Sequence, residues 1–301
     1  MNINDLKIID THHHLWDPTT NKYDWLTASG HEVFNHVYRK ENFINDFQGL
    51  NIIKSVHVQA EINLADTVYE TEWMQQISEA ENDSNDNKLP NAIIGFADFL
   101  DSYVEKTLEM HLQYPNFRGI RHILNYDKNN KEISHAKFDY LKEDLWLNNF
   151  SLLEKYNLSF DLSILFNQTE DAVKLVNKYS NTLFIINHTL SPINIDEKNI
   201  NVWLDKIKLL SSFDNVAIKL SGFGEFNSSW TQESIRPLIL ESIKNFGVER
   251  CMFGSNFPVD KYLSSSRYAD YWTAYFNTVS DFSESEIDKL FYKNAEKFYR
   301  I

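Results

Sequence analysis

The segment Ile8-Ile9-Asp10-Thr11-His12-His13-His14-Leu15-Trp16 joins an apolar pair to an acid and three consecutive histidines. The two β-branched isoleucines predict a short buried strand. Because side chains alternate along a strand, Asp10, His12 and His14 are expected on one face and His13 on the other. Two imidazoles two residues apart at the end of a strand can hold one metal ion or one substrate oxygen. The alternative is a polar loop or an incidental metal-binding tract.

The rest of the chain repeats the alternation of a strand with a helix. Further strands are predicted at 55–61, 91–99, 117–124, 158–164, 182–188, 216–221 and 250–256. Helices are predicted at 40–50, 66–81, 101–112, 138–156, 168–179, 199–213, 234–246, 268–279 and 284–300, the seventh capped by Ser234 and ended by Gly247. The pattern predicts an α/β fold, a closed (β/α)8 barrel in one domain over residues 1–301, with a long loop after the first strand. The alternative is an open doubly wound sheet, but no glycine-rich phosphate loop follows any strand.

Composition narrows the classes of partner and the compartment. The formal net charge of -14 argues against nucleic acid and anionic membranes as partners. Cys251 is the only cysteine, so an intrachain disulfide is excluded and a reducing compartment is expected. No basic segment followed by an apolar run opens the chain, and no apolar stretch has the length of a membrane helix. These features predict a cytoplasmic protein.

Polar residues lie where the predicted strands end, the edge at which active sites of such barrels form. The candidates are His12, His14, Gln59, Glu61, Arg121, Asp161, His188, Lys219 and Asn256. In the second, fifth and seventh strands the apolar positions suit the helix-facing side, so the polar positions are expected to face the interior. An ion pair of Arg121 with Asp161 or Glu61 is the alternative to contact with an anionic substrate. His57 and His122 are expected to be structural, and His135 carries no signal.

With these residues in view, the chain resembles the amidohydrolase superfamily. Within it the resemblance is to the amidohydrolase 2 branch, whose characterised members hydrolyse sugar lactones and 2-pyrone-4,6-dicarboxylate. It spans nearly the whole chain and rests on an ordered set of motifs: Ile9 to Trp16, Val56 to Glu61, Phe117 to His122, Asn187-His188, Met252 to Asp260, and Asn294-Ala295 with Tyr299.

The resemblance implies roles for particular residues. His12 and His14 match the family's His-x-His pair, His188 matches the histidine that ends the sixth strand, and Arg121 matches a substrate contact. Asn256 stands where most relatives carry an aspartate that acts as general base and, in metal-bound members, as a ligand. A carboxamide cannot take a proton from water, so the base is sought among Glu61, Asp161 and His188. Asp260 is expected to lie outside the pocket.

These inferences together predict a hydrolase that opens the lactone ring of a sugar acid or of a carboxylated ring. His12 and His14 would polarise the carbonyl, alone or with one divalent ion, zinc or manganese, that they bind. The residues expected to contact the anionic or polyhydroxylated small-molecule substrate are Arg121, Gln59, Lys219 and Trp16. The alternatives are a metal-dependent decarboxylase of an unsaturated or aromatic acid and a ligand-binding paralogue without catalytic activity.

Overall fold

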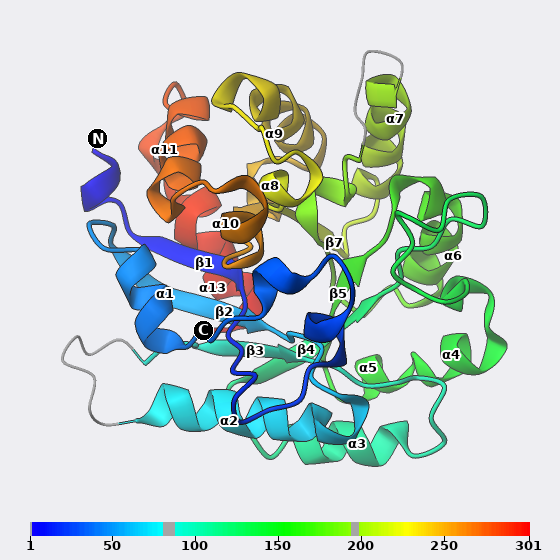
Figure 1. Cartoon of the computed structure of the whole chain (residues 1–301). Coiled ribbons are helices and arrows are strands. Elements are labelled where there is room, and N and C mark those ends of the chain that lie inside the picture. Colours follow the sequence, from blue (N-terminus) through cyan, green and yellow to red (C-terminus); the bar gives the residue numbers. More distant parts are fainter. Residues whose placement is uncertain (1, 81–87, 194–198) are drawn as a thin grey trace.

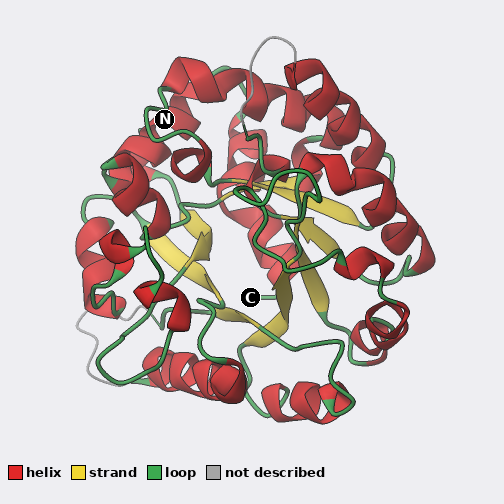
Figure 2. Ribbon diagram, turned by 45° about the vertical axis from the view of Figure 1, so that its right-hand side comes forward, coloured by secondary structure: helices red, strands yellow, loops and turns green. Residues whose placement is uncertain are grey.

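The computed structural model shows eight parallel strands in one sheet that curls into a ring, with helices around it (Figures 1 and 2). It describes residues 2–80, 88–193 and 199–301. The strands pair in chain order and are β1 (Ile8–His13), β2 (Ile52–Val58), β3 (Ala92–Gly95), β4 (Phe117–Ile123), β5 (Ser159–Ser163), β6 (Phe184–Ile186), β7 (Val216–Leu220) and β8 (Cys251–Phe253). The predicted (β/α)8 barrel is confirmed.

The helices follow the strands, as the sequence pattern predicts. They are α1 (Lys40–Asp46), α2 (Thr67–Glu79), α3 (Val104–His111), α4 (Asp144–Asn149), α5 (Leu152–Lys155), α6 (Thr169–Lys178), α7 (Asn199–Ser211), α8 (Phe223–Phe226), α9 (Gln232–Phe246), α10 (Val259–Ser264), α11 (Tyr268–Thr278), α12 (Glu284–Asp288) and α13 (Asn294–Tyr299). The sequence pattern did not predict α8 and α10, which follow β7 and β8, because each is under two turns long. None of the described helices has the length and apolar character needed to cross a membrane.

One predicted helix start is wrong. Thr231, not Ser234, is the N-cap of α9, because the Thr231 and Ser234 side chains each bond the other's backbone N–H in a capping box. Pro237 therefore lies inside the helix rather than in its first turn. Gly247 ends α9 with a φ of 75°, a conformation that favours glycine.

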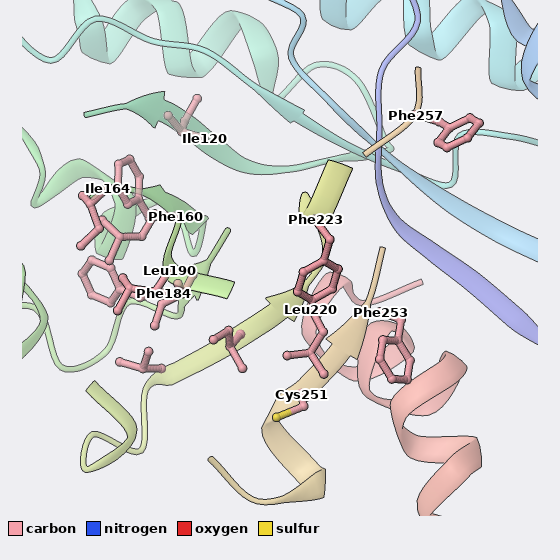
Figure 3. Close-up of a cluster of buried hydrophobic side chains, with 14 of the residues drawn as sticks. Ile120, Phe160, Ile164, Phe184, Leu190, Leu220, Phe223, Cys251, Phe253 and Phe257 are labelled. Atoms are coloured by element: carbon pink, nitrogen blue, oxygen red, sulfur yellow. The ribbon is translucent and has the colours of Figure 1, made fainter. Parts of the chain in front are cut away.

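Two apolar layers hold the barrel together. The outer layer packs the sheet against the helices and includes Phe160, Phe184, Leu220 and Phe253 (Figure 3). The inner layer joins strand residues to α13, whose side chains fill one end of the ring. In Figure 2 the C-terminal end accordingly lies at the middle of the strands.

The expected orientation of β2 is wrong. Val56 and Val58 pack in the inner layer, whereas His57 faces outward and its Nε2 lies 3.2 Å from Glu70 Oε1 on α2. Apolar side chains can fill a barrel interior, and a buried histidine is tolerated on the helix side when it has a partner. The orientations expected for β5 and β7 agree with the structure, since Phe160 and Leu220 lie in the outer layer.

The first strand also departs from strict alternation. Its pairing with β2 is irregular between Asp10 and His13, so Asp10 does not share a face with His12 and His14. Asp10 instead accepts hydrogen bonds from Ser255 Oγ at 2.6 Å and from the Tyr268 hydroxyl of α11 at 2.9 Å. It is a buried structural group, and its contact with Ser255 fastens the start of the barrel to its end.

The barrel closes between the end of β1 and the segment after β8. Asn256 N donates to His12 O at 2.7 Å, and His14 N donates to Phe257 O at 2.8 Å. The His-x-His pair and the residue in the eighth-strand position are therefore held by the bonds of this seam.

Candidate active site

Three histidines meet at the carboxyl ends of β1 and β6. The ring centroid of His12 lies 5.0 Å from that of His14 and 4.3 Å from that of His188. Burial lowers the pKa of each ring well below its usual range. The positive charge of Arg121 lowers all three pKa values further, and that of Lys219 lowers those of His12 and His188. All three imidazoles are therefore neutral near pH 7.

The hydrogen-bond partners assign different roles to the first two rings. His14 Nδ1 donates to Val58 O at 2.7 Å, which leaves its Nε2 as an acceptor. His12 Nδ1 lies 3.4 Å from the Lys219 ammonium, a donor, so the ring hydrogen of His12 belongs on Nε2. His12 Nε2 is buried and has no partner in the described part of the chain. One ring thus presents a donor and the other an acceptor.

Lys219 and Asp161 form an ion pair beneath the histidines. Lys219 Nζ lies 2.5 Å from Asp161 Oδ2, and both side chains are completely buried. Asn187 Nδ2 donates to the same oxygen at 3.1 Å, and the Tyr299 hydroxyl of α13 donates to Asp161 Oδ1 at 3.3 Å. Burial lowers the pKa of Lys219, and the neighbouring Asp161 charge opposes that shift. Asp161 is thus occupied by three donors.

Arg121 is a buried cation without a carboxylate partner. It is 5 % exposed, and its Nη2 donates to Gln59 O at 2.5 Å. Its Nε has no hydrogen-bond partner, and among the residues that the structure describes no acid forms an ion pair with it. Burial lowers the pKa of the guanidinium, but arginine stays charged even when buried. The ion pairs with Asp161 or Glu61 considered from sequence are absent within the described ranges.

Glu61 lies after β2 and pairs with His135, a residue from the loop after β4 that sequence reasoning set aside. His135 Nε2 and Glu61 Oε1 are 2.7 Å apart, and both side chains are partly exposed. Burial lowers the pKa of His135, but the hydrogen bond and the charge of Glu61 outweigh it, so the net shift is upward. Only spatial contact reveals this pair, because 74 positions separate the two residues.

The Glu61–His135 pair gives a testable pH dependence. We expect the His135 pKa, measured by NMR, to lie above the ordinary histidine value of about 6.5. It should fall below that value in Glu61→Gln, where burial and the charge of Arg121 lower the pKa and the Glu61 charge no longer opposes them. Because the folded pKa is raised, the pair stabilises the protein below pH 6.5, and this is lost as pH rises through the folded pKa. Solvent exposure limits the effect to about 1 kcal/mol. An unchanged His135 pKa in the variant would contradict the pairing.

Sequence reasoning missed a second group, which surrounds Asn256. Its Nδ2 donates to Asp260 Oδ1 at 2.8 Å and to Glu225 Oε2 at 3.0 Å. Asp260 of α10 was expected outside the pocket but is fully buried in this cluster. Glu225 lies on α8, and its Oε2 is 4.0 Å from His188 Nε2. The short helices after β7 and β8, which the periodicity did not reveal, bring these acids to the site.

The backbone is unusual at three of these strand ends. Glu61, His188 and Asn256 have φ values of 56°, 51° and 56°, in the left-handed region that residues other than glycine rarely adopt. Such conformations gather at functional sites, where the surrounding structure enforces them. Gly222 also has a positive φ, and a Cβ there would lie 2.7 Å from the His188 ring, so only glycine lets β7 and His188 approach.

Other candidates have structural partners. The Gln59 side chain accepts from Glu61 N at 2.6 Å, which orients the turn after β2. Trp16 is buried, and its Nε1 donates to His36 O at 2.8 Å within the ordered loop after β1. His122 packs outward against Trp146 and is structural as expected.

The donor set does not fit a resident divalent metal ion. Among the described residues no three His, Cys, Asp or Glu side chains are arranged to hold one ion. Asn256 supplies a neutral amide instead of a carboxylate, which is a weaker ligand for zinc or manganese. The positive charge of Arg121 acts on all three histidines and that of Lys219 acts on His12 and His188, which disfavours a further positive charge there.

Comparisons with known proteins place the chain in a family. Residues 9–301 match the sequence model of the amidohydrolase family. The chain is 36% identical over 306 residues to the uncharacterized protein y4mH of Sinorhizobium fredii, covering 99% of this chain and 100% of that protein.

Two solved structures share the fold. An amidohydrolase of Burkholderia multivorans with bound zinc superposes with a TM-score of 0.79 at 18% identity, over 98% of this chain and 99% of the other. A probable 2-pyrone-4,6-dicarboxylic acid hydrolase of Acinetobacter baumannii with citric acid bound superposes with a TM-score of 0.74 at 18% identity, over the same shares. The motifs, the barrel and the family match agree: this chain belongs to the amidohydrolase 2 branch of the amidohydrolase superfamily, a group of hydrolase-type enzymes.

Proposed function

We propose that the protein hydrolyses a lactone whose ring or substituents carry a free carboxylate, such as the lactone of a hexaric acid. The observation that carries this proposal is Arg121, a buried guanidinium with a free Nε and no acidic partner among the described residues. A desolvated cation is costly until an anion pairs with it, and a guanidinium binds a carboxylate through two parallel hydrogen bonds.

The neutral histidines supply the groups that act on the lactone carbonyl. His12 Nε2–H donates to the carbonyl oxygen and to the oxyanion that forms when water attacks. The Lys219 ammonium behind His12 strengthens that donor, because it bonds the opposite ring nitrogen. His14 Nε2 is an acceptor and orients the attacking water or a substrate hydroxyl.

The same contacts rank the candidate bases. Asp161 is paired with Lys219 and lies beneath the histidines, so it supports His12 rather than taking a proton from water. Glu61 is paired with His135, and its backbone N–H donates to the Gln59 side chain. These residues lie on the side of the site where the substrate carboxylate would bind Arg121. Proton transfer therefore falls to the edge formed by His188 and Glu225. Trp16 supports the loop over the first strand.

The two alternatives find less support. A metal-dependent decarboxylase needs a divalent-ion site, and the donor set does not fit one. A charged lysine behind the donor ring of His12 suits the stabilisation of an oxyanion, which an enzyme needs and a protein that only binds ligands does not.

A panel of γ- and δ-lactones of hexonic and hexaric acids, together with 2-pyrone-4,6-dicarboxylate, tests the proposal. Each hydrolysis releases a proton, which a pH indicator records. We expect turnover of at least one carboxylated member and a loss of about a hundredfold or more in kcat for His12→Ala, which removes the oxyanion donor. Exposed His36→Ala is the matched control. Carbon dioxide release without lactone turnover would select the decarboxylase instead.

The donor set also predicts that the reaction is independent of metal. Overnight dialysis against EDTA should change kcat/KM by less than about twofold, since no step needs a Lewis acid when His12 and Lys219 stabilise the oxyanion. Elemental mass spectrometry of the same samples measures zinc and manganese. Loss of turnover with EDTA and its return with either ion would contradict this expectation.

A further inference from the structure

We propose that Glu225 is the general base of this hydrolysis and that Asn256, held by Asp260, positions it. The inference rests on the proposed function and adds to it the base that the amide at position 256 cannot be. The active carboxylate thus comes from α8, after β7, instead of from the end of β8.

The geometry around Asn256 carries the inference. Its amide nitrogen has two hydrogens, and each has its own acceptor: Asp260 Oδ1 at 2.8 Å and Glu225 Oε2 at 3.0 Å. Asp260 also accepts from Gly224 N at 2.9 Å and from Glu225 N at 3.2 Å. Asp260 therefore holds both the backbone that carries Glu225 and the amide that orients its carboxylate.

An aspartate at position 256 could not donate these two hydrogen bonds. It would have no hydrogens to donate, and it would place a third acid against Glu225 and Asp260. An amide at position 256 can donate to both acids, which an aspartate cannot. Asn256 is therefore consistent with a base at Glu225 and does not indicate that the protein has lost its base.

The two acids differ in their environments. Asp260 is completely buried, and burial, followed by the charge of Glu225, raises the pKa of Asp260 to about 8. Glu225 has 37% of its side chain exposed, so water and substrate can reach it. Close packing still raises the pKa of Glu225, and the bond from Asn256 partly offsets that shift. Of the two acids, Glu225 is therefore the one that water and substrate can reach.

Glu225 also faces the histidine cluster. Its Oε2 lies 4.0 Å from His188 Nε2, and the His188 ring lies 4.3 Å from the ring of His12, the proposed oxyanion donor. His188 is a weaker acceptor, because burial and two nearby cations lower its pKa well below the usual range. The titratable and charged groups that face Glu225 are His188, Arg121, His135, Glu61 and Asp260, with the Asn256 amide among them.

The proposed hydrolysis proceeds in two steps. Water oxygen forms a bond to the lactone carbonyl carbon while one water proton passes to Glu225. The tetrahedral intermediate then breaks the ring carbon–oxygen bond, and the protonated Glu225 returns the proton to the leaving ring oxygen. The products are a carboxylic acid and an alcohol in one open chain, and Glu225 is again a carboxylate.

The first experiment compares Glu225→Gln with Glu233→Gln, an exposed acid in the first turn of α9, on the panel member that the wild type hydrolyses fastest. We expect Glu225→Gln to lower kcat about a hundredfold or more, with KM changed less than about threefold. The acidic limb of the kcat profile should disappear, since that limb reports the base. Glu225→Asp should keep the limb at a lower rate, and Glu233→Gln should match the wild type. Circular dichroism checks that each variant is folded.

The second experiment tests the bridge of Asn256. Asn256→Asp should lower kcat and move the acidic limb to higher pH, because the added charge makes Glu225 harder to ionise. The double variant Asn256→Asp with Glu225→Gln should have a higher kcat than Glu225→Gln alone, since the carboxylate and the amide then exchange places. No rescue together with an unmoved limb would overturn the positioning role.

The outcomes separate the two proposals. A wild type that opens no lactone of the panel defeats the proposed function and with it the base. A wild type that turns over, with a Glu225→Gln variant that is equally active and keeps its acidic limb, overturns the assignment of Glu225 alone.

Discussion

Replacing Lys219 by methionine should lower the free energy of unfolding by about 3–5 kcal/mol. The substitution preserves much of the side-chain volume but leaves Asp161 as a buried acid without its cation. Solvent cannot compensate the Asp161 charge, because the Lys219 and Asp161 side chains are both inaccessible in the folded protein. The remaining donors, Asn187 and Tyr299, are neutral and compensate only in part. An uncompensated buried charge is among the most costly single defects a core can carry.

The double variant Lys219→Met with Asp161→Leu separates the charge from the packing. Replacing both members of a buried pair by apolar residues is often close to neutral, so much of the lost stability should return. Urea denaturation followed by circular dichroism measures all three proteins. Lys244→Met, which breaks an exposed pair with Glu241 on α9, is the control and should cost less than about 1 kcal/mol. A double variant as unstable as Lys219→Met would show that volume, not charge, dominates.

Replacing Arg121 by methionine should lower kcat/KM for a carboxylated lactone by about a thousandfold, or roughly 4 kcal/mol. The guanidinium is the buried group available to pair with the substrate's carboxylate, and methionine leaves that anion unpaired. Arg121→Lys should recover little, because an ammonium cannot reproduce the two parallel bonds of a guanidinium. For any neutral lactone that the wild type hydrolyses, Arg121→Met should lower kcat/KM much less.

The same substitution should make the free protein more stable by about 1 kcal/mol or more. Loss of the bond to Gln59 O costs about 1 kcal/mol, but removal of a desolvated and unpaired cation returns several. A carboxylate ligand such as citrate should raise the melting temperature of the wild type and not of Arg121→Met.

Arg118→Met is the matched control, since Arg118 lies on the same strand and its Nε donates to Tyr299 O at 2.9 Å. It should reduce stability without changing KM. A destabilised Arg121→Met protein that still hydrolyses the carboxylated lactone would contradict the role given to Arg121.

The barrel could be predicted from sequence because its evidence is local and repeated. Strands such as 158–164 and 216–221 alternate clearly, so Asp161 and Lys219 could be assigned to the interior before any contact was known. The same rule failed for β2, where Val56 and Val58 fill the interior and His57 finds Glu70 outside. Alternation alone reveals that two faces differ, but which face is interior depends on partners from distant parts of the chain.

The histidines and Arg121 could be located as candidates because they stand at strand ends in recognisable motifs. Glu225, Asp260 and His135 could not, since their positions depend on two short helices and one loop with no periodic signal. The pairing of Lys219 with Asp161 lay beyond the sequence as well, because it needs the register of two strands 58 residues apart.

The packing of α13 has a consequence for kinetics. Ala295, Phe298 and Tyr299 fill the end of the ring opposite the histidines, so that end offers no passage through the barrel. In the proposed reaction, lactone, water and the released acid would all use the same entrance, and the acid would have to depart before the next lactone enters. The product of that reaction would carry one more carboxylate than its substrate, and Arg121 would bind it. Product and substrate thus compete for one form of the enzyme, and the departure of the acid sets an upper limit on the rate of the cycle.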